Sequence, residues 1–438
     1  MERLISPELR RNCWLELTPA RLALMPVVLL LAFYFVHSVA SGQMAVLIPA
    51  AGALFFLVTV LWGSHLAVSG LSQEVANRTW DWQRMSSITP LEMTAGKLIG
   101  SPIYAWYGGV LCLAVLLAAG MGSDMDRAGY AAATLVGLAL LAHATAVIFT
   151  ILAITKYGAS SVTRRRSAAV LFGLAIVLLL SRALDPSATL SSPDAVSWYG
   201  IAWNGDPFWL ASVYAFGAWA WIGTLHLFRV QLGHRNPPWA FAVFALFLMA
   251  YSAGFIAWPD AAIFDEVRLP EGTVASARLL VATFVIGALT LVMLFQERHD
   301  PVTYRRLVPR GGPQRWHLLP RWFIAFGLTT VSAAAWILLY GDTPLSGVVI
   351  AAWLFLLRDA AVILALNFRA VSKPANGLIL VYLAVVYALL PGIFGPSSLF
   401  VPQLTQSIAE LLPPAIEAAA ALALLRLAWG RYIGPATR

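Results

Sequence analysis

Long apolar segments follow one another along this chain at short intervals, and they constrain the fold more than any other feature. A helix needs roughly 20 consecutive, mostly apolar residues to cross a bilayer. Soluble domains carry about 25% charged residues, whereas this chain carries 11% and is 60% hydrophobic. The pattern predicts an all-α polytopic membrane protein with about twelve transmembrane helices. The predicted spans are 21–41, 44–68, 98–120, 129–155, 167–184, 208–228, 238–258, 277–296, 320–340, 345–367, 376–396 and 405–428.

The basic residues give an independent test of this count, because cytoplasmic loops are rich in Lys and Arg. With the N-terminus inside, only four of the 29 basic residues fall in the outer loops: Arg127, Arg182, Arg268 and Arg278. The alternation holds to the end of the chain, so both termini are predicted in the cytoplasm. The composition suits a bacterial inner membrane. The net charge of +8 is mostly an orientation signal, and no concentrated basic domain indicates nucleic-acid binding.

Residues 1–20 predict an interfacial helix that precedes the first span. Ser6 can cap this helix, and Pro7 suits its first position. Apolar residues recur every four positions on one face, which is typical of a helix lying on a membrane surface. The alternative is an ordinary leader with accidental periodicity. The periodic residues are Ile5, Leu9, Cys13 and Leu17.

The connection between the second and third spans has unusual chemistry for a short loop. Residues 72–86 are compatible with a helix that mixes charged residues with Trp80 and Trp82. Thr89-Pro90-Leu91-Glu92 then predicts a capping box with proline at the first helical position, which starts the third span. Lys97 is expected at the level of the lipid headgroups.

This order of residues resembles the coupling-helix region of type-2 ABC exporter permeases. That family carries a Glu soon after its second span, then a Thr, a Pro beside a Ser or Thr, and a Gly-Lys pair that opens the third span. The resemblance covers residues 1–120, and the interfacial helix is similar to the family's N-terminal elbow helix. The alternative is an ordinary basic loop. The matching positions are Glu74, Thr79, Pro90, Gly96 and Lys97, with Arg78 and Arg84 as charged contacts.

The resemblance implies the membrane subunit of an ATP-driven exporter, coupled to a separate ABC-type ATP-binding subunit in two copies. A coupling helix at 71–88 would dock in that subunit. The chain lacks the phosphate-binding G-x-x-x-x-G-K-[ST] pattern, because Gly96-Lys97 is followed by Leu98. We therefore expect no enzymatic activity and no directly bound cofactor. The residues assigned to coupling are Glu74, Arg78, Thr79, Asp81, Arg84, Thr89, Pro90, Gly96 and Lys97.

Twelve spans divide into two halves of six, at 21–228 and 229–438, which suggests a parallel duplication. A Gln-Glu pair follows the second span of each half, at Gln73 and at Gln296. The loop 297–319 would then be a second coupling segment, although it lacks the Thr-Pro-Leu-Glu start. Either one chain supplies both halves of a transport pathway as a pseudo-dimer, or the protein is a homodimer in which the seventh to twelfth spans form an accessory bundle.

Charged residues within the spans are expensive and must face protein or water. Arg358 and Asp359 lie in the middle of the tenth span, and Glu410 and Glu417 share a face of the last span. A pair of prolines between the two glutamates predicts a broken helix there. We assign these four residues to a translocation pathway. The alternative is a structural ion pair.

No spacing in the sequence indicates a catalytic or metal site. The histidines of the spans, such as His143, have no partner four residues away, so they predict hydrogen-bonded core residues. Two other functions remain open: an ion-coupled secondary transporter that uses the charges of the spans, and a membrane scaffold that transports nothing. The sequence does not identify a substrate.

Overall fold

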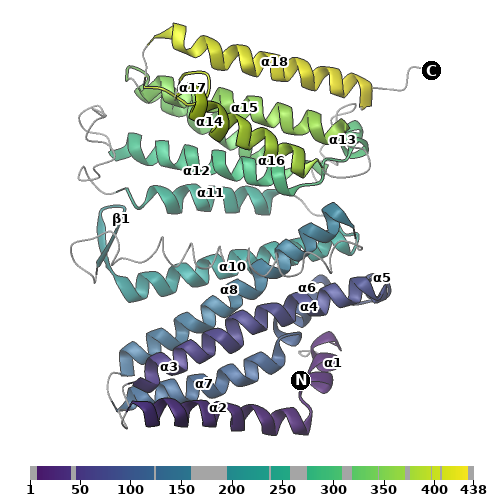
Figure 1. The fold of residues 1–438 in the computed structure, drawn as a ribbon, viewed down its shortest axis with the longest axis vertical. Coiled ribbons are helices and arrows are strands. Elements are labelled where there is room, and N and C mark those ends of the chain that lie inside the picture. Colours follow the sequence, from purple (N-terminus) through teal and green to yellow (C-terminus); the bar gives the residue numbers. More distant parts are fainter. Residues whose placement is uncertain are drawn as a thin grey trace. The chain divides into compact units, whose positions relative to one another are not determined.

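The structure is a computed structural model in which helices account for nearly all regular structure (Figure 1). Contacts divide the chain into two compact units. Unit 1 contains Met1–Val196 and Trp203–Asn236, and unit 2 contains Ser197–Ala202 and Pro237–Arg438. The structure describes residues 7–40, 46–122, 125–158, 195–235, 238–256, 274–307, 318–343, 345–369, 375–395, 397–404 and 407–432.

In unit 1 the membrane-spanning helices pack through small residues. Helix α8 lies against α4 and α10, and α3 lies against α7. A Cβ atom at Gly137 of α8 would come within 2.8 Å of Val213 on α10, so glycine permits the close approach that is usual between membrane helices. The helices of this unit are α1 (Pro7–Glu16), α2 (Pro19–Val39), α3 (Leu47–Phe55), η2 (Phe56–Trp62), α4 (Gly63–Ala76), α5 (Thr79–Arg84), α6 (Pro90–Ala95), η3 (Gly96–Gly100), α7 (Ile103–Met121), α8 (Met125–Tyr157) and α10 (Gly205–Gln231).

In unit 2, α15 is the central helix, and it packs along α18 and beside α12 and α14. Trp336 of α14 is fully buried, and its indole nitrogen donates to the carbonyl of Ser276 at 2.9 Å. The helices of this unit are α11 (Trp239–Ala253), α12 (Val274–Gln296), α13 (Pro301–Leu307), α14 (Arg321–Tyr340), α15 (Leu345–Arg369), α16 (Asn376–Ala384), η7 (Val385–Leu389), α17 (Leu390–Phe394) and α18 (Ile408–Tyr432).

A two-stranded hairpin, β1 (Ala195–Trp198) and β2 (Ile201–Asn204), precedes α10. Tyr199 and Gly200 form its turn, and both have positive φ angles. The indole nitrogen of Trp198 donates to the carbonyl of Tyr251 at 3.1 Å, which fixes the turn end of the hairpin to α11.

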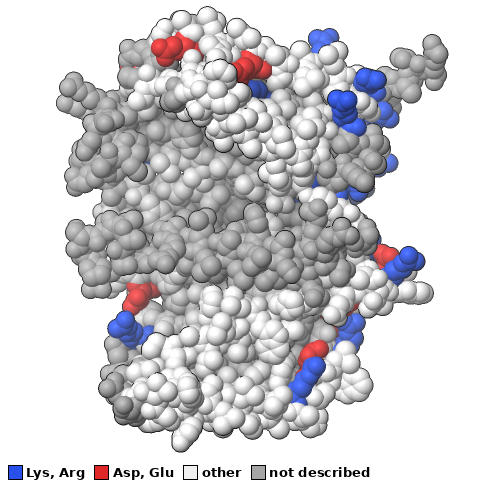
Figure 2. Space-filling model, viewed as in Figure 1, with Lys and Arg blue, Asp and Glu red and all other residues white. Residues whose placement is uncertain are grey.

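The helices confirm an integral membrane architecture. Ten helical runs in the described part of the chain are long and apolar enough to cross a bilayer, and α11 is a shorter apolar helix. Figure 2 shows mostly white atoms over the helices, with the charged atoms concentrated at the edges of the face. Each predicted span that the structure describes coincides with a helix. The predicted span 167–184 lies outside the described residues, so the count of twelve and the duplication stay predictions.

Two local expectations were wrong. The single helix predicted at 71–88 is divided, because α4 ends at Ala76 and Arg78 adopts a left-handed conformation with φ 61° before α5 begins. The break predicted in the last span is absent, since α18 runs through Pro413 and Pro414. Proline has no N–H group, so the carbonyls of Ala409 and Glu410 in the first turn of α18 lose their usual helical donors. Both residues are exposed, and other donors can therefore bond to these carbonyls.

Candidate functional site

A network of charges, in which Glu8 and Lys97 are buried, joins α1 to the start of the third span. We call it the elbow cluster, and its members are Glu8, Arg11, Glu74 and Lys97. The Lys97 ammonium donates to Glu8 at 2.7 Å and also pairs with Glu74. Arg11 donates to Glu8 at 2.8 Å and to Glu74 at 2.7 Å. Two positive groups therefore face two carboxylates. Lys97 itself is only 1% exposed, so its charge is neutralised by these carboxylates inside the protein.

Glycine lets α1 approach η3 closely enough to build this cluster. A Cβ atom at Gly96 would lie 2.4 Å from Cγ of Glu8, and one at Gly100 would lie 3.0 Å from the Asn12 amide nitrogen. The Asn12 side chain donates to the carbonyl of Gly96 at 3.2 Å. The face of α1 that is buried in protein is thus polar, whereas its apolar residue Trp14 is 80% exposed.

The short helix α5 is fixed on one side and exposed on the other. Trp80 is 5% exposed and packs against the ring of Phe228 on α10. Arg84 donates through Nε to the carbonyl of Gln231 at the end of α10, at 2.6 Å. On the opposite side Trp82 is 74% exposed. The start of α5 is joined to α4 through the turn at Arg78, and its end is bonded to α10 through Arg84. The helix therefore presents an aromatic side chain outward while both of its ends are held.

The turn from α5 into the third span has the predicted capping box. The Thr89 hydroxyl accepts from the amide of Glu92 at 3.3 Å, and the Glu92 carboxylate accepts from the amide and the hydroxyl of Thr89, each at 2.8 Å. These hydrogen bonds hold the pKa of Glu92 below its usual value. Pro90 occupies the first position of α6, as predicted.

The nine residues assigned to coupling fall into two groups in the structure. Glu74, Gly96 and Lys97 belong to the interior of unit 1, so Lys97 contacts two carboxylates and lies inside protein, not at an open headgroup position. The other six lie on α5, α6 or the turns beside them. Those six are Arg78, Thr79, Asp81, Arg84, Thr89 and Pro90.

A second cluster of polar groups lies within the spans of unit 2. We call it the α15 cluster, and its members are Arg358, Asp359, Tyr382, Tyr387 and Glu417. Arg358 donates through Nε to Oδ1 of Asp359 at 2.9 Å. It also donates to Glu417 at 2.5 Å and to the Tyr387 hydroxyl at 3.0 Å. Asp359 is fully buried and accepts from the hydroxyls of both tyrosines.

The π-helical segment η7 explains how two tyrosines five residues apart reach one carboxylate. In an ordinary α-helix such residues point about 140° apart around the axis. A π turn, with hydrogen bonds from residue i to i+5, returns the fifth residue toward the starting face. The amide of Leu390 bonds to the carbonyl of Val385 in this way. Tyr382 and Tyr387 therefore both contact Asp359.

The structure brings together three of the four residues assigned to the pathway. Arg358, Asp359 and Glu417 are bonded to one another through the arginine. Glu410 is exposed in the first turn of α18 and does not join them. Neither tyrosine was predicted from the sequence, where their only signal is a pair of phenol groups in a largely apolar span.

A cavity of about 250 Å³ adjoins the α15 cluster. Apolar side chains of α12, α14 and α15 form most of its wall, and Asp359 and Tyr387 are also among the lining residues. Thr283 and Thr329 also line it, and their hydroxyls donate to the carbonyls of Leu279 and Ala325 on their own helices. The arrangement is typical of small-molecule sites, which combine an apolar surface with a few polar groups.

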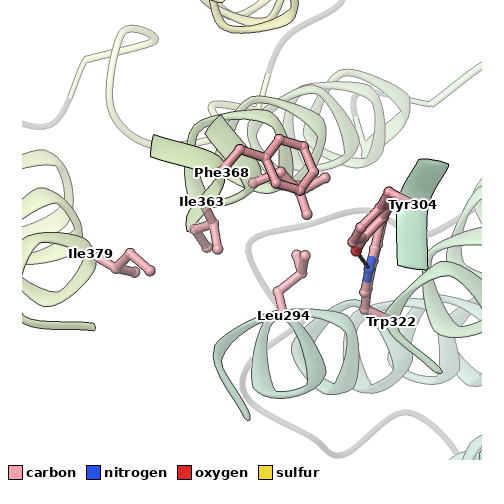
Figure 3. Close-up of a cluster of buried hydrophobic side chains, with 8 residues drawn as sticks. Leu294, Tyr304, Trp322, Ile363, Phe368 and Ile379 are labelled. Atoms are coloured by element: carbon pink, nitrogen blue, oxygen red, sulfur yellow. Dashed lines mark hydrogen bonds between the residues drawn. The ribbon is translucent and has the colours of Figure 1, made fainter. Parts of the chain in front are cut away.

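The loop predicted as a second coupling segment contains α13, which is bound to its neighbours. The Tyr304 hydroxyl accepts from the Trp322 indole at 2.9 Å and contacts the His299 ring at 2.9 Å. Figure 3 shows Tyr304 and Trp322 beside a cluster of apolar side chains that includes Phe368. Burial raises the pKa of Tyr304 above its ordinary value. Residues 308–317 of this loop lie outside the described residues.

In the residues that the structure describes, no group of three or more His, Cys, Asp or Glu side chains is placed to hold a metal ion.

The comparisons with known proteins found no relative of this chain. No family model matches the chain, and neither a curated protein nor a solved structure matches it.

Proposed function

We propose that the chain is the transmembrane permease subunit of an ATP-driven ABC exporter in a bacterial inner membrane, with both termini in the cytoplasm. The observation that carries the proposal is the construction of α5. A short helix that projects Trp82 outward, and is fixed on its other face, is suited to occupy a groove on a soluble partner. The residue order around it resembles the coupling region of type-2 ABC permeases.

The contacts around α5 supply a route for mechanical coupling. A displacement of α5 would act on α4 through the left-handed turn at Arg78 and on α10 through Trp80 and Arg84. Helix α4 carries Glu74, which is bonded to α1 and to the start of the third span through the elbow cluster. ATP-driven movement of two partner subunits would therefore reach several spans together, as rigid-body switching requires.

The test is purification of the full chain with its native partners, followed by assay of bound ATPase activity. We expect a nucleotide-hydrolysing subunit with the wild type. Trp82→Ala is expected to weaken its retention about tenfold or more, because exposed tryptophans that become buried at an interface often dominate its binding energy. Trp14→Ala is the matched control, since it removes another exposed tryptophan, from α1.

Two results would contradict this function. One is the absence of any ATPase from wild-type protein that remains folded. The other is equal retention of the ATPase by Trp82→Ala and wild type in a complex that still hydrolyses ATP, which would place the docking surface elsewhere.

The α15 cluster favours a second candidate, an ion-coupled secondary transporter. Charges buried within spans commonly mark substrate or ion pathways, and such a carrier needs no ATPase. Transport into vesicles separates the two candidates. An ion gradient without ATP would drive the carrier, whereas the permease would require ATP and its partner.

A further inference from the structure

We propose that the arginine-rich end of unit 2 binds the headgroup of an anionic phospholipid. Helices α12, α15 and α18 end here, and α14 and α16 begin here. Their ends meet at one apolar core that includes Tyr304 of α13, part of which is drawn in Figure 3. Six described arginines belong to these helix ends and to α13. We call them the arginine patch: Arg298, Arg305, Arg306, Arg321, Arg369 and Arg431.

Contacts of α13 bring the ends of α15 and α18 together. The Tyr304 ring packs edge-on against Phe368 of α15, with ring centroids 5.1 Å apart, and against Trp429 of α18, with centroids 6.2 Å apart. Arg305 donates to the carbonyl of Tyr432 at the end of α18, at 2.9 Å. The arginines of these three helices therefore lie in one region. In Figure 2, blue atoms gather beside the place where Figure 1 draws α13 and the end of α18.

The arginine patch carries more positive charge than its surroundings offset. In the described part of this end, its carboxylates are those of Glu297 and Asp300. Glu297 accepts from the first amide of α14 at 2.9 Å, and Asp300 accepts from an amide in the first turn of α13 at 3.2 Å. Two carboxylates thus accompany six arginines. The connecting segments 308–317 and 370–374 contain no Asp or Glu in their sequence.

Helix dipoles leave this excess largely unchanged. A helix C-terminus carries about −0.5 of a charge and an N-terminus about +0.5. The C-termini of α12, α15 and α18 meet the N-termini of α14 and α16 at this end, so the partial charges nearly cancel. The usual preference for basic residues in the last turn of a helix therefore accounts for only a small part of the six arginines.

Unit 1 neutralises its cations with its own carboxylates. Lys97 and Arg11 of the elbow cluster are paired in this way, and so is Arg21. By contrast, both Arg369 and Arg431 are exposed, and no carboxylate among the described residues forms a salt bridge with either of them. The cations of unit 2 thus leave an anion to be supplied from outside the chain.

The depth of the patch selects a lipid as the source of this anion. The helices that meet here are long and apolar enough to cross a bilayer, so their shared ends lie at the level of the headgroups. Guanidinium groups bind phosphate through paired hydrogen bonds, and basic pockets between the ends of transmembrane helices bind acidic headgroups. Val302 of α13 is 47% exposed and Phe323 of α14 is 52% exposed. These apolar side chains suit acyl chains, which a free phosphate or an acidic protein does not offer.

Competition between lipids tests the ligand. The full chain is purified in a neutral detergent, and its binding of radiolabelled dioleoylphosphatidylglycerol is measured in mixed micelles. We expect saturable binding that the unlabelled glycerol lipid displaces at least about tenfold better than dioleoylphosphatidylcholine does. Inorganic phosphate in excess should not displace the label, because it lacks the acyl chains.

Two double variants test the location. Arg369→Gln with Arg431→Gln should weaken binding about tenfold or more, because each arginine near a headgroup adds to the attraction. Arg10→Gln with Arg235→Gln is the matched control. It removes two exposed arginines from unit 1 and changes the total charge equally, and it should bind as wild type does. Salt gives a test that needs no variant, since raising NaCl from about 0.1 M to about 0.5 M should weaken wild-type binding several-fold by screening.

The proposal fails if the choline lipid displaces the label as well as the glycerol lipid does, or if salt has no effect. It also fails if the two double variants bind equally, which would indicate general attraction to basic surfaces. Displacement by polyglutamate as effective as that by the glycerol lipid would assign the patch to an acidic protein partner instead. Because no ATPase takes part, these outcomes are independent of the test of the proposed permease function.

Discussion

The elbow cluster and the α15 cluster both bury an ion network among helices, but they differ in balance and in surroundings. In the elbow cluster Lys97 and Arg11 face Glu8 and Glu74, so the charges cancel. In the α15 cluster one arginine faces two carboxylates and a cavity adjoins them. The balanced elbow cluster needs no further group to neutralise it, whereas the α15 cluster has one carboxylate more than it has cations.

The two clusters also differ in how they are assembled. Glycines at positions 96 and 100 bring α1 onto η3, so the elbow cluster depends on backbone approach. The α15 cluster depends on η7, whose wide turn directs two tyrosines to one carboxylate. In the first case the charged side chains fix a helix in place. Both clusters include a π-helical segment, since Lys97 lies in η3, but in the α15 cluster the π turn brings two tyrosine hydroxyls to one carboxylate.

The largest effect should come from Arg358→Met. It removes the only cation of the α15 cluster and leaves Asp359 and Glu417 without a partner of opposite charge. Breaking a buried pair in this way typically costs about 3–5 kcal/mol. We expect a lower midpoint of unfolding in detergent and reduced yield. Stability equal to wild type would show that the carboxylates are already neutralised by another group.

Lys97→Met should cost less, about 2–3 kcal/mol, although Lys97 is the more deeply buried cation. The reason is redundancy, because Arg11 is bonded to both carboxylates of the elbow cluster and stays in place. Unfolding in detergent measures the difference. A loss larger than that of Arg358→Met would reverse this order and show that Arg11, at 45% exposure, is too solvated to compensate.

The sequence allowed the prediction of helix positions better than that of side-chain partners. Apolar runs and basic loops located α2, α8 and α12 because both signals are local. The capping box at Thr89 was also predictable, since all its atoms lie within four residues. Glu8 was missed as the partner of Lys97, because their contact joins residues 89 positions apart through a close approach that only the packed helices reveal.

The two wrong expectations share a physical cause, which is that tertiary context overrides local propensity. Nothing in Asn77-Arg78 demands a left-handed turn, yet Arg78 adopts one where α4 gives way to α5. Paired prolines usually break a helix, yet Pro413 and Pro414 lie near the exposed start of α18, where the loss of two hydrogen bonds is tolerated. Similarly, no rule of sequence pattern placed a π turn beside Tyr387.

Gly96→Ala tests the backbone approach on which the elbow cluster depends. The new Cβ would lie 2.4 Å from Glu8, so α1 must shift, at a cost of about 1–3 kcal/mol for an overpacked site. Limited proteolysis should then release α1 more readily. Gly217→Ala on α10 is the matched control, because nothing lies within 4 Å of its Cβ, and it should leave proteolysis unchanged. Equal cleavage of both variants would contradict close packing at Gly96.

The smallest effect is expected at the capping box, and pH distinguishes it from packing effects. Thr89→Ala should destabilise the start of α6 by about 1 kcal/mol. The pKa of Glu92 is lower in the folded protein than its ordinary value of 4.5, so its ionised carboxylate stabilises the fold above that pH and loses this contribution as pH falls through the folded pKa. Thr89→Ala removes the hydroxyl that donates to this carboxylate. The difference in stability between wild type and variant should therefore shrink below about pH 4.5. If the difference in stability between wild type and Thr89→Ala stays constant down to pH 3, the threonine hydroxyl stabilises the helix start only as an acceptor. The ionised Glu92 carboxylate would then contribute nothing through its bond to this hydroxyl.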